Sequence, residues 1–135
     1  MAAPRLVLVS TVLDTPDPAR LAAFYERLLG WRVRGDDETW VTMQSPRGGR
    51  GLAFQLEPRY VRPTWPSAPG AQQMMCHLDI AVADVDAAVA HAQECGATLA
   101  EYQPQDHVRV CLDPDGHPFC LFLETGSLDD VEPST

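Results

Sequence analysis

Two segments decide the fold of this chain: residues 10–17, STVLDTPD, and residues 77–84, HLDIAVAD. Each ends in an aspartate, Asp17 or Asp84, that precedes a run of helix-forming residues, and each run stops at a glycine, Gly30 or Gly96. Helix termini favour these residues, because an aspartate caps the first turn and a glycine adopts the left-handed conformation that ends the last one. The aspartates are 67 residues apart and the glycines 66, which indicates an internal duplication.

Extended segments follow each predicted helix. In the first half they are residues 31–34, 39–44 and 51–57, and in the second half residues 98–102, 107–112 and 118–124. A turn at residues 45–49 or 113–116 precedes the last segment of each half. The pattern predicts one α+β domain over residues 1–126, with repeat halves at about 5–58 and 73–125, a linker or lid at 59–72 and a flexible acidic tail at 127–135.

Composition limits the class of protein. Hydrophobic residues make up 45% of the 135 residues, enough for one domain with a core. The net charge of −9 argues against nucleic acid and anionic membranes as partners, since both bind clustered positive charge. The four cysteines form no CxxC pair, so we expect reduced thiols and a cytoplasmic location. The apolar stretch before Asp14 is too short to span a bilayer, and we interpret it as a buried strand rather than a signal peptide.

Alternation along the strands separates an apolar face from a polar one, because successive side chains point to opposite sides of a sheet. Leu78, Ile80 and Val82 share one face, so His77 and Asp79 share the other. Applied to the other strands, this rule predicts a cleft on the concave side of the sheet, lined by Ser10, Gln55, Glu57, His77, Asp79, Cys120, Phe122 and Glu124. The alternative is a polar face that lies in water, as in many antiparallel sheets.

Three stretches of the chain resemble the vicinal oxygen chelate superfamily, the glyoxalase and bleomycin-resistance group. They are residues 17–31 (DPARLAAFYERLLGW), residues 77–84 (HLDIAVAD) and residues 113–119 (DPDGHPF). The chain is similar to the compact bacterial glyoxalase-like domains of this superfamily along nearly its whole length. The resemblance implies two tandem βαβββ modules that form a curved mixed sheet with the helices on the outside, often in a homodimer.

The resemblance also implies, for the enzymatic members, a divalent metal held by four side chains on the concave face. The matching positions here are Ser10, Gln55, His77 and Cys120, and only His77 is a strong ligand for a hard cation. We therefore expect no cofactor and no four-ligand metal site. A shifted divalent-metal site stays open, in which Asp79, Glu57, Glu124 or Gln55 joins His77.

Single residues in the predicted cleft suggest further roles. His77 and Asp79 are the candidate catalytic residues, as a metal-free acid and base, or else a pair that only hydrogen-bonds a ligand. No histidine stands beside Cys120 in the sequence, so we interpret this thiol as a small buried hydrophobic residue. Trp65 lies in a proline-rich loop, where it covers either the cleft or a second subunit.

These observations predict a glyoxalase-like protein that binds a small organic molecule in the cleft, in the manner of resistance proteins that sequester drugs. The candidate binding residues are Ser10, Trp40, Gln55, Glu57, Trp65, His77, Cys120 and Phe122. The alternative is an enzyme, either a lyase, isomerase or dioxygenase with a shifted metal site or a metal-free acid–base catalyst centred on His77. A purely structural or interaction domain is a third reading.

Overall fold

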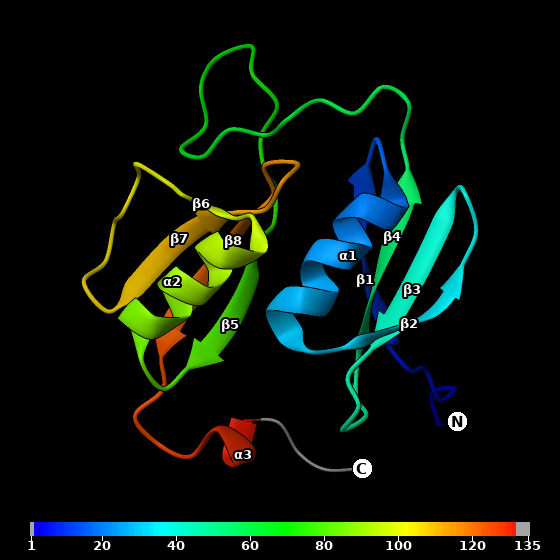
Figure 1. Ribbon diagram of the computed structural model, residues 1–135. Coiled ribbons are helices and arrows are strands. Elements are labelled where there is room, and N and C mark those ends of the chain that lie inside the picture. The colour runs from blue at the N-terminus through cyan, green and yellow to red at the C-terminus, as the bar shows by residue number, and fades with distance from the viewer. Residues whose placement is uncertain (1, 132–135) are drawn as a thin grey trace.

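The computed structural model describes residues 2–131 and shows two halves of the same design (Figure 1). The first half runs β1 (Ser10–Thr15), α1 (Pro18–Leu29), β2 (Arg32–Asp36), β3 (Trp40–Gln44) and β4 (Gly51–Leu56). The second half runs β5 (Leu78–Val82), α2 (Val85–Cys95), β6 (Thr98–Leu99), β7 (Val108–Leu112) and β8 (Pro118–Leu123). The predicted α+β fold of two tandem βαβββ modules is confirmed.

Both long helices begin and end where the sequence indicates. Asp17 caps α1 by accepting a hydrogen bond from the Arg20 amide at 3.2 Å, and Asp84 caps α2 by accepting from the Ala87 amide at 3.0 Å. Gly30 ends α1 in the left-handed conformation with φ of 71°, and its amide donates to the Glu26 carbonyl. A residue with a Cβ adopts this backbone conformation at a cost, which explains the glycine at the helix end.

The strands form two separate four-stranded sheets with the same order, β1-β4-β3-β2 and β5-β8-β7-β6. In each half the first and last strands pair in parallel, and the last three strands pair antiparallel with one another. The register places Asp14 opposite Gln55 in the first sheet and Asp79 opposite Cys120 in the second. The duplication therefore builds two mixed sheets that do not join into one closed surface.

One hydrophobic core joins the two halves. Helices α1 and α2 contact each other and pack on the sheets, on the side facing the viewer in Figure 1. Phe24 and Tyr25 of α1 are fully buried and meet Phe119 of β8, with ring centroids 6.0 and 6.4 Å away. Large aromatic side chains that bury against the opposite half bind the halves into one folding unit.

The N-terminal segment departs from the prediction. The apolar stretch was expected to be a buried strand, but β1 begins only at Ser10, and Leu6, Val7, Leu8 and Val9 before it are exposed. The reason is the length of the partner strand, because β4 begins at Gly51, directly opposite Ser10. Residues ahead of Ser10 therefore have no strand ladder to join, although the Val9 carbonyl accepts one hydrogen bond from Gly51.

Two further segments differ from the predicted elements. Strand β6 covers only Thr98–Leu99, because the Gln103 side chain bonds both the amide and the carbonyl of Val110 and takes the place of a strand there. Residues 128–131, in the segment expected as a tail, form the short helix α3 (Leu128–Val131), and Arg47 pairs with Asp129 at 2.7 Å. Residues 132–135 of that segment lie outside the described residues.

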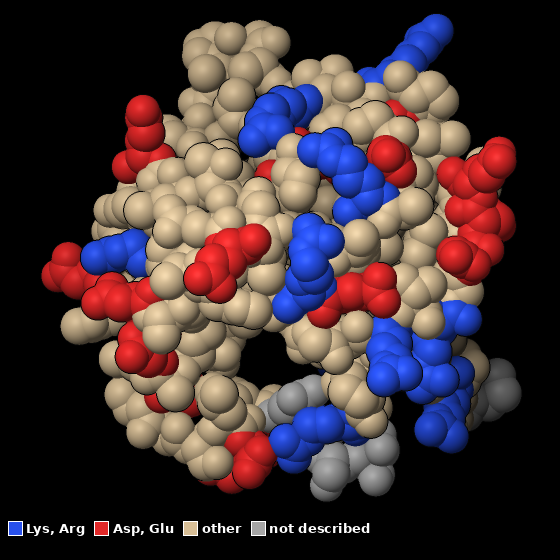
Figure 2. All heavy atoms as spheres, viewed as in Figure 1, with Lys and Arg blue, Asp and Glu red and all other residues tan. Residues whose placement is uncertain are grey.

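The helix side of the surface carries acidic and arginine side chains in alternation (Figure 2). Figure 2 also shows a hollow between the two halves, below the centre of this view, consistent with sheets that do not join. None of the helices within residues 2–131 is long and apolar enough to cross a membrane.

Candidate functional site

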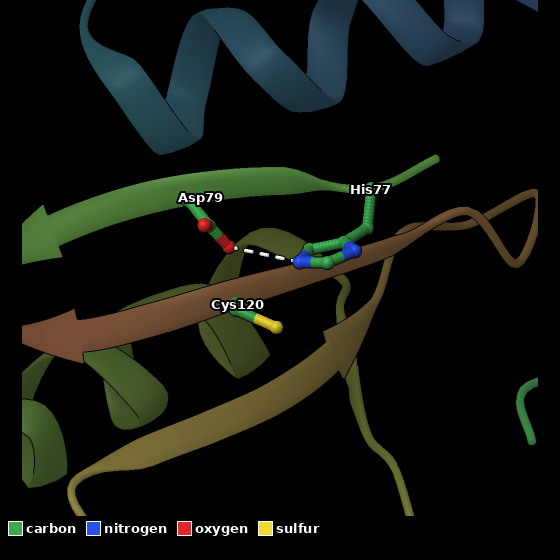
Figure 3. Close-up of side chains that lie close together, drawn as sticks. All are labelled: His77, Asp79 and Cys120. Atoms are coloured by element: carbon green, nitrogen blue, oxygen red, sulfur yellow. Dashed lines mark ion pairs between the residues drawn. The ribbon is translucent and has the colours of Figure 1, made fainter. Parts of the chain in front are cut away.

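A cluster of three polar side chains, His77, Asp79 and Cys120, lies on the second sheet, on the face turned away from the core. His77 directly precedes β5, and Asp79 follows two residues later, so both side chains point to the same side. The parallel register places Cys120 of β8 opposite Asp79. His77 Nε2 lies 3.0 Å from Asp79 Oδ1, and the donor atoms of the three residues all lie within 4.8 Å of one another (Figure 3).

Trp65 covers this cluster from the linker between the halves. Its indole stacks on the His77 ring, with centroids 4.9 Å apart and an interplanar angle of 22°, and it meets Tyr102 edge-on at 5.4 Å. The linker is held in a loop because Thr64 bonds the Gln72 carbonyl through both its amide and its hydroxyl. Of the two roles expected for Trp65, the structure shows the first: within the chain, it covers the cleft.

A cavity of about 590 Å³ opens beside the cluster, a size typical of small-molecule sites. Its polar groups gather at the His77 and Asp79 side chains, whereas most of the remaining lining is aromatic or aliphatic. The lining residues are Trp65, His77, Asp79, Pro104, Gln105, Val108, Val110, Cys120 and Phe122. The cavity thus offers apolar contact area with a few polar groups at one place, which is the usual pattern of a binding pocket.

The thiol of Cys120 is held in its neutral form. Burial, with the negative charge of Asp79 as a second cause, raises the pKa of Cys120 to about 11. Cys120 is only 5% exposed, as the sequence predicted for a small buried residue. Strand pairing brings His77, which is distant from Cys120 in the sequence, next to this thiol.

The comparisons with known proteins agree with this fold. Residues 10–122 match the glyoxalase-like domain family. This chain is a member of that family. A glyoxalase-related enzyme from Fulvimarina pelagi is 19% identical and has a TM-score of 0.65, with 87% of this chain and 88% of that chain covered. No curated protein sequence matches the chain.

Two further solved structures share the glyoxalase-like fold. A glyoxalase/bleomycin resistance protein/dioxygenase family enzyme from Burkholderia phytofirmans PsJN is 18% identical, with a TM-score of 0.63 over 84% of this chain and 95% of that one. Lactoylglutathione lyase from Agrobacterium tumefaciens is 15% identical, with a TM-score of 0.60 over 90% of this chain and 96% of that one. Similarity at these sequence identities shows the fold only, so the activity has to be inferred from the residues of the site.

The glyoxalase-like domain gathers only part of the predicted cleft in this cavity. His77, Asp79, Cys120, Phe122 and Trp65 all line it. The predicted residues of the first half do not, because they lie on the other sheet. The Ser10 hydroxyl bonds the Thr11 carbonyl, the Gln55 amide donates to Asp14 at 3.1 Å, and Trp40 lies opposite Gln55.

The two glutamates of the expected shifted metal site also stay apart from the His77 cluster. Glu57 lines a second cavity, of about 320 Å³, together with Asp14, Tyr60 and His117. Glu124 follows β8 and its carboxylate accepts a hydrogen bond from the Gly126 amide. Among residues 2–131, the group of three or more metal-binding side chains that the structure brings together is His77, Asp79 and Cys120.

The four positions that the family resemblance matches to metal ligands do not fit a shared site. Ser10 and Gln55 belong to the first sheet and do not line the cavity beside His77 and Cys120. The register also shows that two of them are not equivalent in the duplication, since Gln55 corresponds to Phe122 and Cys120 corresponds to Ala53. These four residues therefore do not form a metal site with two donors from each half.

Sequence reasoning missed a buried polar network that joins the halves at the turn before β8. His117 Nδ1 lies 2.8 Å from the Asp113 carboxylate, and its Nε2 lies 2.8 Å from the Asp14 carbonyl. Tyr25 donates to Asp113 at 2.7 Å, and Thr15 donates to Asp115 at 2.6 Å. Contacts between residues about 100 positions apart leave no local signal in the sequence.

His117 faces acceptors at both ring nitrogens, which favours the charged imidazolium. Burial opposes the charge and by itself lowers the pKa of His117, but the hydrogen bond and charge of Asp113, with smaller contributions from the Asp14 carbonyl and Asp115, outweigh burial and raise it. Tyr60 also approaches Nε2, at 3.3 Å, while it donates to the Asp115 carbonyl at 2.7 Å. This network fixes the relative position of the halves.

The four remaining cavity residues, which the sequence analysis missed, lie on β7 and in the segment before it. Val108 and Val110 alternate along this strand, and the register puts them opposite Phe122 and Cys120. The alternation rule, applied to residues 107–112, would have found them. Pro104 and Gln105 lie in the irregular segment before β7, for which no periodicity exists.

Proposed function

We propose that this glyoxalase-like domain binds a small organic molecule in the cavity beneath Trp65, without the four-ligand metal site that the family resemblance implies. The observation that carries the proposal is the stack of Trp65 on His77 above a cavity of about 590 Å³. A stacked aromatic pair at the edge of an apolar pocket provides a rigid surface for a second flat group. The proposed small molecule therefore has an aromatic or conjugated ring.

The polar end of the cavity selects the second feature of this molecule. Asp79 retains 64% side-chain exposure, so it can meet a ligand that enters from solvent, and His77 stands beside it at 3.0 Å. A carboxylate next to an imidazole binds a group that donates hydrogen bonds or carries positive charge. We expect an amine, amidine or hydroxyl on the bound ring system.

Two matched tryptophan variants test the proposal. Aromatic amines and phenols are screened against metal-free protein in the presence of a chelator, by thermal shift and then by titration calorimetry. Trp65→Ala should weaken the binding of a hit about tenfold to hundredfold, because it removes the stacking surface. Trp40→Ala should leave the affinity unchanged, since Trp40 lies on the first sheet, outside the cavity. Equal affinity for wild type and Trp65→Ala contradicts the proposal.

An acid–base catalyst is a second candidate function, favoured by the 3.0 Å contact between His77 Nε2 and Asp79 Oδ1. A carboxylate that holds an imidazole in place is a common way to orient a general base. Metal-dependent lyase, isomerase or dioxygenase chemistry is the further alternative. Turnover of a bound compound by wild type that Asp79→Asn abolishes, beyond its effect on affinity, supports an enzyme. No turnover in either protein supports a binding domain.

We also propose a homodimer in the cytoplasm. The exposed apolar residues Leu6, Val7 and Leu8, the first of them 86% exposed, support a second copy as the partner of this segment. The four cysteines are free, which suits a reducing compartment. Sedimentation of wild type should give twice the chain mass, and Leu6→Glu with Leu8→Glu should shift it to one chain. A monomeric wild type contradicts the homodimer.

A further inference from the structure

We propose that His77, Asp79 and Cys120 form a three-donor site for a thiophilic divalent cation, with Zn²⁺ as the ion that the donor set fits best. The inference rests on the same cavity as the proposed function, because the three side chains line its floor. The site keeps two of the four positions that the family resemblance matches to ligands, His77 and Cys120. It differs from that site because Asp79 is the third donor and the first half of the molecule contributes none.

The chemistry of the three donors points to a borderline cation. The cluster offers one imidazole nitrogen, one carboxylate oxygen and one sulfur. Mg²⁺ and Ca²⁺ prefer oxygen donors alone, whereas Zn²⁺ takes nitrogen, sulfur and oxygen in a tetrahedral arrangement. Zinc sites with three protein donors keep a fourth position open, and here the cavity lies beside the cluster.

The spacing of the donor atoms is close to what such an ion needs. A tetrahedral ion about 2.0–2.3 Å from its donors holds them roughly 3.3–3.8 Å apart. The donor atoms here are within 4.8 Å of one another, and His77 Nε2 is already 3.0 Å from Asp79 Oδ1. Side-chain rotation on two paired strands covers the difference. No movement of one half against the other is required.

The same geometry argues against a nucleophilic thiol activated by histidine. In such a relay the carboxylate holds one ring nitrogen and the thiol bonds the other, so the imidazole lies between them. Here the nitrogen bonded to Asp79 lies at the end of the His77 ring turned toward both other donors, and Cys120 lies beneath the ring (Figure 3). The three donors converge on one space, as ligands of an ion do.

The first half of the molecule shows that strand pairing alone does not create the cluster. The positions that correspond to His77, Asp79 and Cys120 in the duplication are Ser10, Val12 and Ala53. None of these three side chains has a nitrogen, carboxylate or sulfur donor. The two sheets share one backbone arrangement, but only the second sheet has the nitrogen, carboxylate and sulfur donors at these three positions.

The experiment compares two thiols, Cys120 and Cys76, that line different cavities. Untagged protein is freed of metal with a chelator, exchanged into buffer, and titrated with Zn²⁺ in competition with a chromophoric indicator. Wild type should bind one ion per chain. Cys120→Ser and His77→Ala should each weaken binding at least tenfold, whereas Cys76→Ser should not, because Cys76 lines the second cavity. Circular dichroism checks that each variant is folded.

A spectroscopic readout identifies the thiol independently of affinity. Co²⁺ bound to wild type should give the sulfur-to-metal charge-transfer band of a thiolate ligand, absent in Cys120→Ser and present in Cys76→Ser. No stoichiometric Zn²⁺ binding, or a charge-transfer band that survives Cys120→Ser, overturns the inference. Small-molecule binding is titrated separately, in the presence of a chelator. Failure of the zinc proposal would therefore not contradict small-molecule binding, and the reverse also holds.

Discussion

The two halves of this molecule have the same backbone arrangement and different chemistry on it. Both pair their first and last strands in parallel, with Asp14 opposite Gln55 in one sheet and Asp79 opposite Cys120 in the other. The cavity beside His77 and Asp79, with Trp65 above it, lies on the second sheet. A duplicated fold thus provides the platform twice, and side-chain identity decides which copy holds the site.

The halves also differ in the turn that precedes their last strand. In the second half, Asp113 and His117 in this turn bond Tyr25 and the Asp14 carbonyl of the first half. The corresponding residues of the first half are Pro46 and Arg50, which cannot make this network. We therefore expect the halves to fold as one unit, although only one of them carries the proposed site. Substitutions in the core, in the turn and in the cavity test these two expectations separately.

The largest effect is expected where the aromatic core crosses between the halves. Phe119→Ala removes a fully buried ring that contacts Phe24 and Tyr25, and it should lower the free energy of unfolding by about 3–5 kcal/mol. Urea unfolding followed by tryptophan fluorescence and by circular dichroism should show one transition that shifts as a whole. Two transitions, of which only one shifts, would mean that the halves unfold independently.

Phe122→Ala is the matched control on the same strand. Phe122 points to the other face and lines the cavity, and it is only partly buried. This change should therefore cost less stability than Phe119→Ala and should weaken the binding of the small molecule.

The next largest effect is expected at the turn that joins the halves. His117→Gln removes the charged bond to Asp113, which is 1% exposed, and should lower the free energy of unfolding by about 2–3 kcal/mol near pH 6. Because the pKa of His117 is raised in the fold, its contribution is complete below the ordinary histidine pKa of about 6.5 and is lost as the pH rises through the folded-state value. The difference between wild type and variant should shrink from pH 6 to pH 9. A constant difference would show that His117 is neutral in the fold.

The residues in these tests differ in whether the sequence alone predicted their role. The helices, the succession of strands along each half and the polar face of β5 were predicted from capping residues, a 67-residue repeat and alternation, all of which can be read directly from the sequence. The contact of His77 with Cys120 and the network around His117 connect residues 40 to 100 positions apart. Such contacts depend on strand register and on how the halves pack, and no local pattern encodes either.

The predicted cleft was too wide for a related reason. Alternation correctly separates the face of Ser10, Gln55 and Trp40 from the core, but it does not say whether two sheets share one concave surface. In this fold the sheets stay separate, and Ser10, Gln55 and Trp40 do not line the cavity beside His77.

A smaller effect is expected from Thr15→Val. The Thr15 hydroxyl donates to Asp115 and accepts from the Asp17 amide, and the side chain is fully buried. Valine has nearly the same shape, and the second half carries Val82 at the corresponding position. The free energy of unfolding in urea should fall by about 1–2 kcal/mol, since the buried Asp115 carboxylate and the Asp17 amide each lose a partner. No change would mean that water replaces the hydroxyl.

The smallest effect is expected from Arg20→Gln. Arg20 lies 3.6 Å from Asp115, but 59% of its side chain is exposed, so solvent screens the pair. The free energy of unfolding should change by less than about 0.5 kcal/mol. A loss comparable to that of Thr15→Val would mean that the charge of Asp115, and not its hydrogen bonds, holds the turn.

The most direct test of the site assignment is an amide chemical-shift titration of ¹⁵N-labelled, metal-free protein with a small molecule found in the screen. We predict that the largest shifts fall on Trp65, on residues 77–82 and on residues 118–123, while β1, β3 and β4 of the first half stay unchanged. Shifts centred on residues 10–15 and 40–44, with the second sheet unaffected, would contradict the claim that the second half alone carries the site.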